Sequence, residues 1–245
     1  MPPFSSSGTI FLKIRLQIIA VLLAFVLALP VVAGELPPAF DARYRVELGG
    51  MTLGEVTITL QYENGEYHYR KKTKTKGLVS IFRRDTITES STGKIEANDI
   101  VVSSYRFLHK KRKKPKESTV DFSLAGLASG VHKGQSYSIN VPDHVFDRAS
   151  VELALMRDSG AKALTYHVVQ KGRLAHYSFR LQGEKNYVLP AGEFSCEEYQ
   201  VERSNAKRRT TICLSDELNN LPVRATHDEK GKIVTMSLVS VEFQK

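Results

Sequence analysis

The chain has 245 residues, a formal net charge of +9 at neutral pH and only two cysteines. This length falls within the range of one larger all-β domain, so no second domain is required. The excess of Lys and Arg favours anionic partners, although a solvated basic surface explains it equally well.

Residues 1–33 are predicted to be a cleavable signal peptide. Lys13 and Arg15 precede an apolar run that ends at Pro30, and Val31-Val32-Ala33 supplies a cleavage site. The run is shorter than the roughly 20 residues of a membrane-spanning helix, and an uncleaved anchor is the alternative. We therefore expect a single β-rich domain over residues 34–245, located in the periplasm.

Two of the 35 Lys and Arg residues and none of the 26 acids lie in residues 1–33, which leaves the remainder a net charge of +7. In an exported protein, such a charge favours phospholipid headgroups, lipopolysaccharide phosphates or acidic glycans over nucleic acid. Peripheral membrane contact is compatible with this charge. Neither cysteine lies near the cleavage site, so no lipoprotein anchor is expected.

Period-two alternation of apolar and polar residues, interrupted by turn residues, predicts antiparallel strands along most of the domain. Asn64-Gly65 is typical of a two-residue hairpin turn, because both residues tolerate positive φ. The predicted strands cover residues 40–48, 56–62, a segment starting at Tyr67, 100–108, 118–124, 193–201, 208–214, 223–227 and 232–243.

A second hairpin is predicted at Lys171-Gly172. Symmetric pairing about this turn sets Tyr166 opposite Tyr177, and all the apolar side chains then share one face. The same register sets His167 opposite His176 on the polar face, which makes them a candidate metal-binding pair. No third ligand can be placed from the sequence, so we expect ordinary histidines and no cofactor.

One helix is predicted over residues 148–157, with Asp147 as its N-cap and Gly160 just beyond its end. The fold class that follows is mainly β: a large curved antiparallel sheet, an incomplete barrel or β-spiral, with this short helix in or across its concave side. Side chains could fill the concavity, or a groove could remain for an apolar chain.

Cys196 and Cys213 are predicted to form a cross-strand disulfide. A two-residue turn at Ser204-Asn205 would place them directly opposite each other, within bonding reach. A four-residue turn from Ser204 to Lys207 would instead place Ser215 opposite Cys196. A redox pair is disfavoured, because neither a helix start nor a Cys-x-x-Cys motif is present.

Catalytic motifs are scarce. Ser91-Thr92-Gly93-Lys94 matches a Ser-x-x-Lys pattern, but that nucleophile acts from a helix start, and here the four residues are predicted to form a turn. No catalytic residue is predicted.

Two basic tracts are candidate ligand-binding surfaces. One is Lys110, Lys111, Arg112, Lys113 and Lys114 with Lys116, predicted at a hairpin tip, and the other is Arg70-Lys71-Lys72 with Lys74 and Lys76. The alternative is that these charges only discourage edge-to-edge strand pairing and solvate a loop.

The order of these features resembles a bacterial periplasmic family known as domain of unknown function 3108. The matching segments are Tyr44-Arg45-Val46, Gly54, Asp147-Arg148-Ala149-Ser150, Leu189-Pro190-Ala191-Gly192-Glu193-Phe194 and Leu221-Pro222-Val223-Arg224. The resemblance implies a periplasmic antiparallel β-fold with an envelope role and no catalytic motif.

Three functional classes follow from the sequence. The first is a non-catalytic binder of an amphiphilic or anionic envelope component, such as a lipid or a lipid-linked glycan. The second is a scaffolding or interaction protein of the cell wall or outer membrane. The third is a hydrolase of an envelope polymer, because active sites assembled from distant residues leave no motif.

Overall fold

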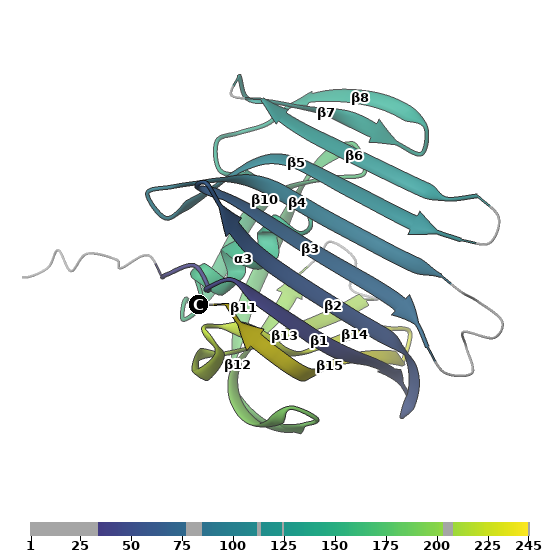
Figure 1. Cartoon of the computed structure of the whole chain (residues 1–245), viewed down its shortest axis with the longest axis vertical. Coiled ribbons are helices and arrows are strands. Elements are labelled where there is room, and N and C mark those ends of the chain that lie inside the picture. The colour runs from purple at the N-terminus through teal and green to yellow at the C-terminus, as the bar shows by residue number, and fades with distance from the viewer. Residues whose placement is uncertain (1–33, 77–84, 112–113, 124, 203–207, 245) are drawn as a thin grey trace, which may run out of the picture. The chain divides into compact units, whose positions relative to one another are not determined.

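The computed structural model describes residues 34–76, 85–111, 114–123, 125–202 and 208–244. Fifteen strands form one sheet in the order β8-β7-β6-β5-β4-β3-β2-β1-β15-β14-β13-β12-β11-β10-β9. All neighbours are antiparallel except β9 and β10. Because β8 and β9 are edge strands, the sheet is not closed, and the predicted mainly-β fold with a large curved sheet is confirmed (Figure 1).

The strands follow the period-two pattern of the sequence. Their bounds are β1 Phe40–Leu48, β2 Met51–Glu63, β3 Glu66–Thr75, β4 Thr86–Glu96, β5 Asp99–Lys110, β6 Lys116–Ser123, β7 Leu127–His132, β8 Gln135–Asn140, β9 Val145–Phe146, β10 Ala163–Gln170, β11 Arg173–Leu189, β12 Gly192–Glu202, β13 Arg208–Ser215, β14 Leu221–Glu229 and β15 Lys232–Phe243. A short 3-10 helix, η1, covers Asp216–Leu218.

The chain traverses the sheet in two halves that meet at its centre. Strands β1 to β8 extend in sequence order toward one edge, and the later strands return from the other edge until β15 pairs with β1. The helix α3 (Ser150–Arg157) lies in sequence between β9 and β10, the two adjacent parallel strands of the second half. It lies on the inner side of the sheet (Figure 1).

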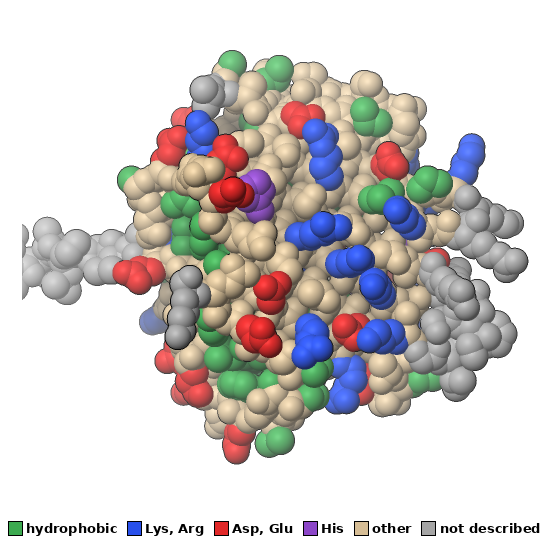
Figure 2. Space-filling view, viewed as in Figure 1, with side chains coloured by type: hydrophobic (Ala, Val, Ile, Leu, Met, Phe, Trp, Pro, Cys, Tyr) green, Lys and Arg blue, Asp and Glu red, His purple; other side chains and the backbone are tan. Residues whose placement is uncertain are grey.

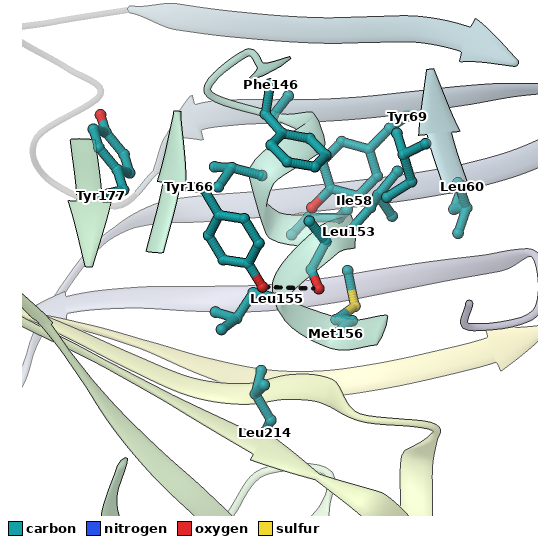
Figure 3. Close-up of a cluster of buried hydrophobic side chains, with 14 of the residues drawn as sticks. Ile58, Leu60, Tyr69, Phe146, Leu153, Leu155, Met156, Tyr166, Tyr177 and Leu214 are labelled. Carbon is teal, nitrogen blue, oxygen red and sulfur yellow. Dashed lines mark hydrogen bonds between the residues drawn. The ribbon is translucent and has the colours of Figure 1, made fainter. Parts of the chain in front are cut away.

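The helix is the centre of the core. Val151, Leu153, Ala154, Leu155 and Met156 are at most 3% exposed, and they belong to one buried cluster with the inward side chains of the sheet. Figure 3 shows Leu153, Leu155 and Met156 among side chains from β2, β3, β10 and β13. In the part of the chain that the structure describes, side chains therefore fill the concave side of the sheet instead of leaving an apolar groove.

Asp147 stabilises the start of this helix, but the helix begins two residues later than predicted and its N-cap is Ala149 rather than Asp147. One carboxylate oxygen, Oδ1, accepts hydrogen bonds from the backbone N–H groups of Ala149 (2.6 Å) and Ser150 (3.0 Å). The first residue of the helix is Ser150. At its other end, Arg157 pairs with Asp99, which ties the helix to the β4–β5 turn.

Both predicted hairpins are present. Asn64 and Gly65 have φ of 51° and 78°, as their turn requires. In the Lys171-Gly172 hairpin, Tyr166 lies opposite Tyr177 and His167 opposite His176, as predicted.

The predicted register of β12 and β13 is wrong. Glu198, not Cys196, lies opposite Cys213, and Glu197 lies opposite Leu214. This is the register of the longer turn, in which the two strands are displaced by two residues. The turn itself, residues 203–207, lies outside the described residues.

The described part of the chain contains no helix with the length and hydropathy needed to span a bilayer.

Candidate functional site

The β3 strand separates two kinds of side chain by strict alternation. Tyr67 and Tyr69 point into the core and are at most 1% exposed. Arg70, Lys72 and Lys74 point to the opposite face, because successive side chains of a strand alternate sides. The basic tract predicted in this segment is therefore a row of cations along one strand.

Neighbouring strands extend this row into a basic surface. Lys72 lies opposite Thr57 of β2 and Thr88 of β4. We call the surface the cationic face, and define it by Arg70, Lys72, Lys74, Arg106 and Lys110 with the flanking hydroxyl residues Thr57, Thr59, Thr86, Thr88 and Ser90. Figure 2 shows Lys and Arg side chains gathered over these strands.

Two open hollows lie on either side of the cation row. The one toward β2 has a volume of about 340 Å³, and the one toward β5 has a volume of about 430 Å³. Arg70, Lys72 and Lys74 line both hollows, so the row forms a ridge between them.

The cations of this surface differ in their acidic partners. Arg106 forms a double hydrogen bond with Asp121 of β6, and Lys76, next to the row, pairs with Glu55. Within the described residues, by contrast, Arg70, Lys72 and Lys74 have no ion pair or hydrogen bond through their side chains. The row is thus positively charged. The acid in the wall of the hollow toward β2 is Glu55, which lies opposite Lys74 but pairs with Lys76.

Lys71 does not belong to the cationic face, although it lies within the predicted tract. Lys71 lies two residues after Tyr69, so its side chain points to the inner side of the sheet. There its Nζ donates a hydrogen bond to Oε1 of Glu152 on α3 at 2.6 Å. Tyr69 donates to the other oxygen of the same carboxylate at 2.7 Å. Glu152 therefore attaches the helix to β3, and this contact was not predicted from the sequence.

The second predicted tract borders the cationic face at one end. Lys110 ends β5 and lines the hollow toward β5. Lys111 and Lys114 are exposed. Arg112 and Lys113 lie outside the described residues. The structure thus brings Lys110 beside Arg70, Lys72 and Lys74, two tracts that the sequence left separate.

The histidine pair is formed, but without further ligands. The ring centroids of His167 and His176 are 4.8 Å apart. Over the described ranges, no cluster of three or more His, Cys, Asp or Glu residues could hold a metal ion. The pair alone supplies two ligands, whereas protein zinc sites use three or four protein ligands.

Cys196 and Cys213 form a disulfide bond despite the displaced register. Their Cα atoms are 5.4 Å apart, within the usual range, so the bond joins residues that are diagonal rather than directly opposite. Both residues are at most 3% exposed. A hollow of about 360 Å³ beside Cys196 has acidic residues such as Glu184 and Asp216 in its wall.

The Ser-x-x-Lys motif has a structural environment unlike that of a nucleophile. Ser91 and Lys94 both lie in β4, rather than in the predicted turn, and at this spacing they point to opposite faces. Ser91 is fully buried, donates to Oδ2 of Asp147 at 2.5 Å and accepts from the Tyr67 hydroxyl at 2.9 Å. Burial raises the pKa of Asp147 to about 6.

These features describe a class of protein: an open, mainly antiparallel β-sheet wrapped on one helix, with a cationic outer face. The family model described as "Protein of unknown function (DUF3108)" matches residues 43–239. The chain therefore belongs to this family of unknown function, as its motifs indicated. A comparison with curated proteins finds no match to the chain.

Three solved structures are similar to this chain at low sequence identity. A β-barrel-like protein of domain of unknown function DUF1849 from Brucella abortus has a TM-score of 0.56 and 13% identity, covering 86% of this chain and 99% of that one. A candidate exported protein with a YmcC-like fold from Bacteroides fragilis has a TM-score of 0.34 and 12% identity, with 86% and 99% covered. A candidate lipoprotein from Parabacteroides distasonis has a TM-score of 0.31 and 8% identity, with 85% and 97% covered. The Brucella protein supports the β-barrel-like fold, and no activity follows from it.

Proposed function

We propose that this chain is an exported, non-catalytic envelope protein whose cationic face binds the phosphate groups of an anionic envelope component, a lipid headgroup or a lipid-linked glycan. The observation that carries the proposal is the row of Arg70, Lys72 and Lys74, which faces solvent without an acidic partner in the described chain. Charge alone would not suffice, since solvated cations are common on protein surfaces.

The geometry of the row suits a ligand with several anionic groups. Alternate residues of a strand are ~6.7 Å apart, so the three cations follow one another at a regular spacing along β3. Threonine and serine hydroxyls flank the row on both sides and can donate hydrogen bonds to phosphate oxygens. The guanidinium of Arg70 adds a bidentate donor.

Export is part of the proposal. Lys13, Arg15 and the apolar run after them indicate a signal peptide, and the Cys196–Cys213 disulfide suits an oxidising compartment such as the periplasm. Both observations are consistent with an envelope component as the partner.

The apolar part of an amphiphile is not included in the proposed contact. The inward side chains of the sheet and the helix pack against one another, so the described residues leave no apolar groove for an acyl chain. This packing favours scaffolding in the cell wall or outer membrane as the second candidate function. The two candidates differ in whether phosphate-bearing surfaces bind the isolated protein.

Co-sedimentation with vesicles tests the proposal. The mature protein should bind vesicles containing phosphatidylglycerol, and should bind pure phosphatidylcholine vesicles much less. Each cation near an anionic surface contributes about 1 kcal/mol, so the triple variant Arg70→Gln, Lys72→Gln, Lys74→Gln should bind about a hundredfold more weakly. Its salt dependence should also be flatter.

A matched variant removes the same charge elsewhere. Lys162→Gln, Lys230→Gln, Lys232→Gln changes three exposed lysines away from the cationic face and should bind like the parent. Equal weakening of both triple variants would show that only net charge matters, and would refute the assigned face. Lipopolysaccharide micelles in place of vesicles distinguish a lipid-linked glycan from a simple headgroup. If the parent binds neither, scaffolding becomes the better account.

A further inference from the structure

Hairpins from opposite ends of the sheet meet at one point. The Tyr137 ring of β8 packs against the β10–β11 turn so closely that a Cβ on Gly172 would lie 3.1 Å from its Cδ1 atom. Strand β8 is one edge of the sheet, and β10 is next to the other edge. This contact therefore brings the two ends of the open sheet together.

Two turns with the sequence Lys-Gly lie near this contact between Tyr137 and Gly172. Lys133-Gly134 connects β7 to β8, and Lys171-Gly172 connects β10 to β11. Both lysines have φ of 54°, and both glycines also have positive φ. Each turn thus holds an exposed lysine at its tip.

His132 lies on the same face of the sheet as Tyr137. His132 lies opposite Gln135, and Gly130 lies opposite Tyr137. Because His132 and Gly130 are two residues apart in β7, the side chains of His132 and Tyr137 are neighbours on one face of the sheet. The His132 ring nitrogen Nδ1 is 3.2 Å from the Ser118 hydroxyl. The ring is therefore fixed beside the junction of the two turns.

The groups that converge at this junction are cationic. Burial lowers the pKa of His132, and Lys133, Lys171 and Arg173 lower it further. In the described chain, none of these three cations has an ion pair. Asp121 acts electrostatically on Tyr137, and it is already paired with Arg106.

Unneutralised like charges at a contact between two hairpins oppose that contact, because they repel over distances shorter than the Debye length. The Tyr137–Gly172 packing holds the hairpins together despite this repulsion. We propose that the junction of His132, Lys133, Lys171 and Arg173 is a second anion site, which binds a phosphate group and so bridges the two ends of the sheet. Ammonium and guanidinium groups are the donors that phosphate prefers.

The site shares no residue with the cationic face, so the two proposals can fail separately. Inorganic phosphate serves as the probe, compared with chloride at matched ionic strength. At a concentration of about ten times its Kd, phosphate should raise the Tm of the mature protein by about 3–5 °C.

Lys171→Asn is the test variant, because Asn-Gly is a favoured sequence for this turn and the change removes the charge while keeping the turn. In chloride it should be more stable than the parent, since repulsion is relieved, and it should lose most of the phosphate effect. Lys230→Asn is the matched control: Lys230-Gly231 is a third turn of this kind, with φ of 58° and 80°, but it lies beside Asp228 and Glu229. This control should keep the full phosphate effect.

NMR of the His132 ring gives a readout that does not depend on stability. Phosphate at fixed pH should shift its ring resonances in the parent and in Lys230→Asn, and not in Lys171→Asn with Arg173→Gln. Any of three results would overturn the proposal: no phosphate effect beyond that of chloride, an equal effect in Lys171→Asn, or an effect lost from the Arg70, Lys72, Lys74 variant instead. The last result would place phosphate on the cationic face and leave the proposed function standing.

Discussion

Asp147 should make the stability of this protein fall as pH rises from acid toward neutral. Its carboxyl group is fully buried between β4 and the start of α3. It accepts hydrogen bonds from the Ser91 hydroxyl and from the backbone of Ala149 and Ser150. Burial outweighs these hydrogen bonds and raises the pKa to about 6 from 3.8. The folded protein therefore binds this proton more tightly than the unfolded chain does.

The sign and size of the effect follow from linkage. Because the folded pKa is the higher one, the stabilisation is fully present below the unfolded value and is lost as pH rises through about 6. The two pKa values differ by about two units, which corresponds to about 3 kcal/mol of unfolding free energy. Paired carboxylates such as Asp99, whose pKa Arg157 lowers against the opposing effect of burial, act in the other direction.

Urea denaturation of Asp147→Asn and the parent over a range of pH isolates this contribution. The difference in unfolding free energy, parent minus variant, should fall by about 2–3 kcal/mol between about pH 4 and pH 7. Asp143→Asn, a change at an exposed carboxylate four residues earlier, should show no such trend. A parent-minus-variant difference that stays constant with pH would refute the reasoning, because it would mean that Asp147 titrates alike in the folded and unfolded states.

Two further predictions concern stability. Cys196→Ser should lower the Tm by about 6–12 °C, because the disulfide to Cys213 closes a loop whose constraint contributes about 3 kcal/mol; calorimetry of parent and variant measures this, and an unchanged Tm would contradict it. Glu152→Gln should lower the Tm by about 3–8 °C, because the Lys71 ammonium, only 22% exposed, loses its carboxylate. Adding Lys71→Met should recover part of that loss, and a double variant no more stable than Glu152→Gln would contradict the pairing.

The sequence specified the faces of the strands better than their register. A one-residue slip exchanges the two faces of a strand, so apolar alternation excludes it, as in the Lys171-Gly172 hairpin. A two-residue slip leaves every side chain on its own face. The apolar pattern around Cys196 and Cys213 therefore could not distinguish the two-residue from the four-residue turn, and the register chosen was wrong while the disulfide was right.

The candidate sites depend on contacts that no local pattern contains. Lys71 could have been assigned to the core, because it continues the inward series of Tyr67 and Tyr69. Its partner Glu152 could not, since the two residues are 81 positions apart and meet only when the helix crosses the sheet. The same holds for the Tyr137–Gly172 contact, which depends on how strongly the sheet curves.

The topology explains why both proposed ligand sites lie outside the packed core rather than inside it. In this open, curved sheet, α3 and the aromatic side chains of β1, β3, β10 and β12 fill the concave side. The polar groups drawn into that core, such as Asp147 and Glu152, are used in holding the helix. The proposed ligand contacts are therefore on the outer face and at the hairpin ends, where Arg70, Lys72 and Lys171 have no acid to pair with in the described structure. A phosphate-bearing partner would supply the missing charge at both places.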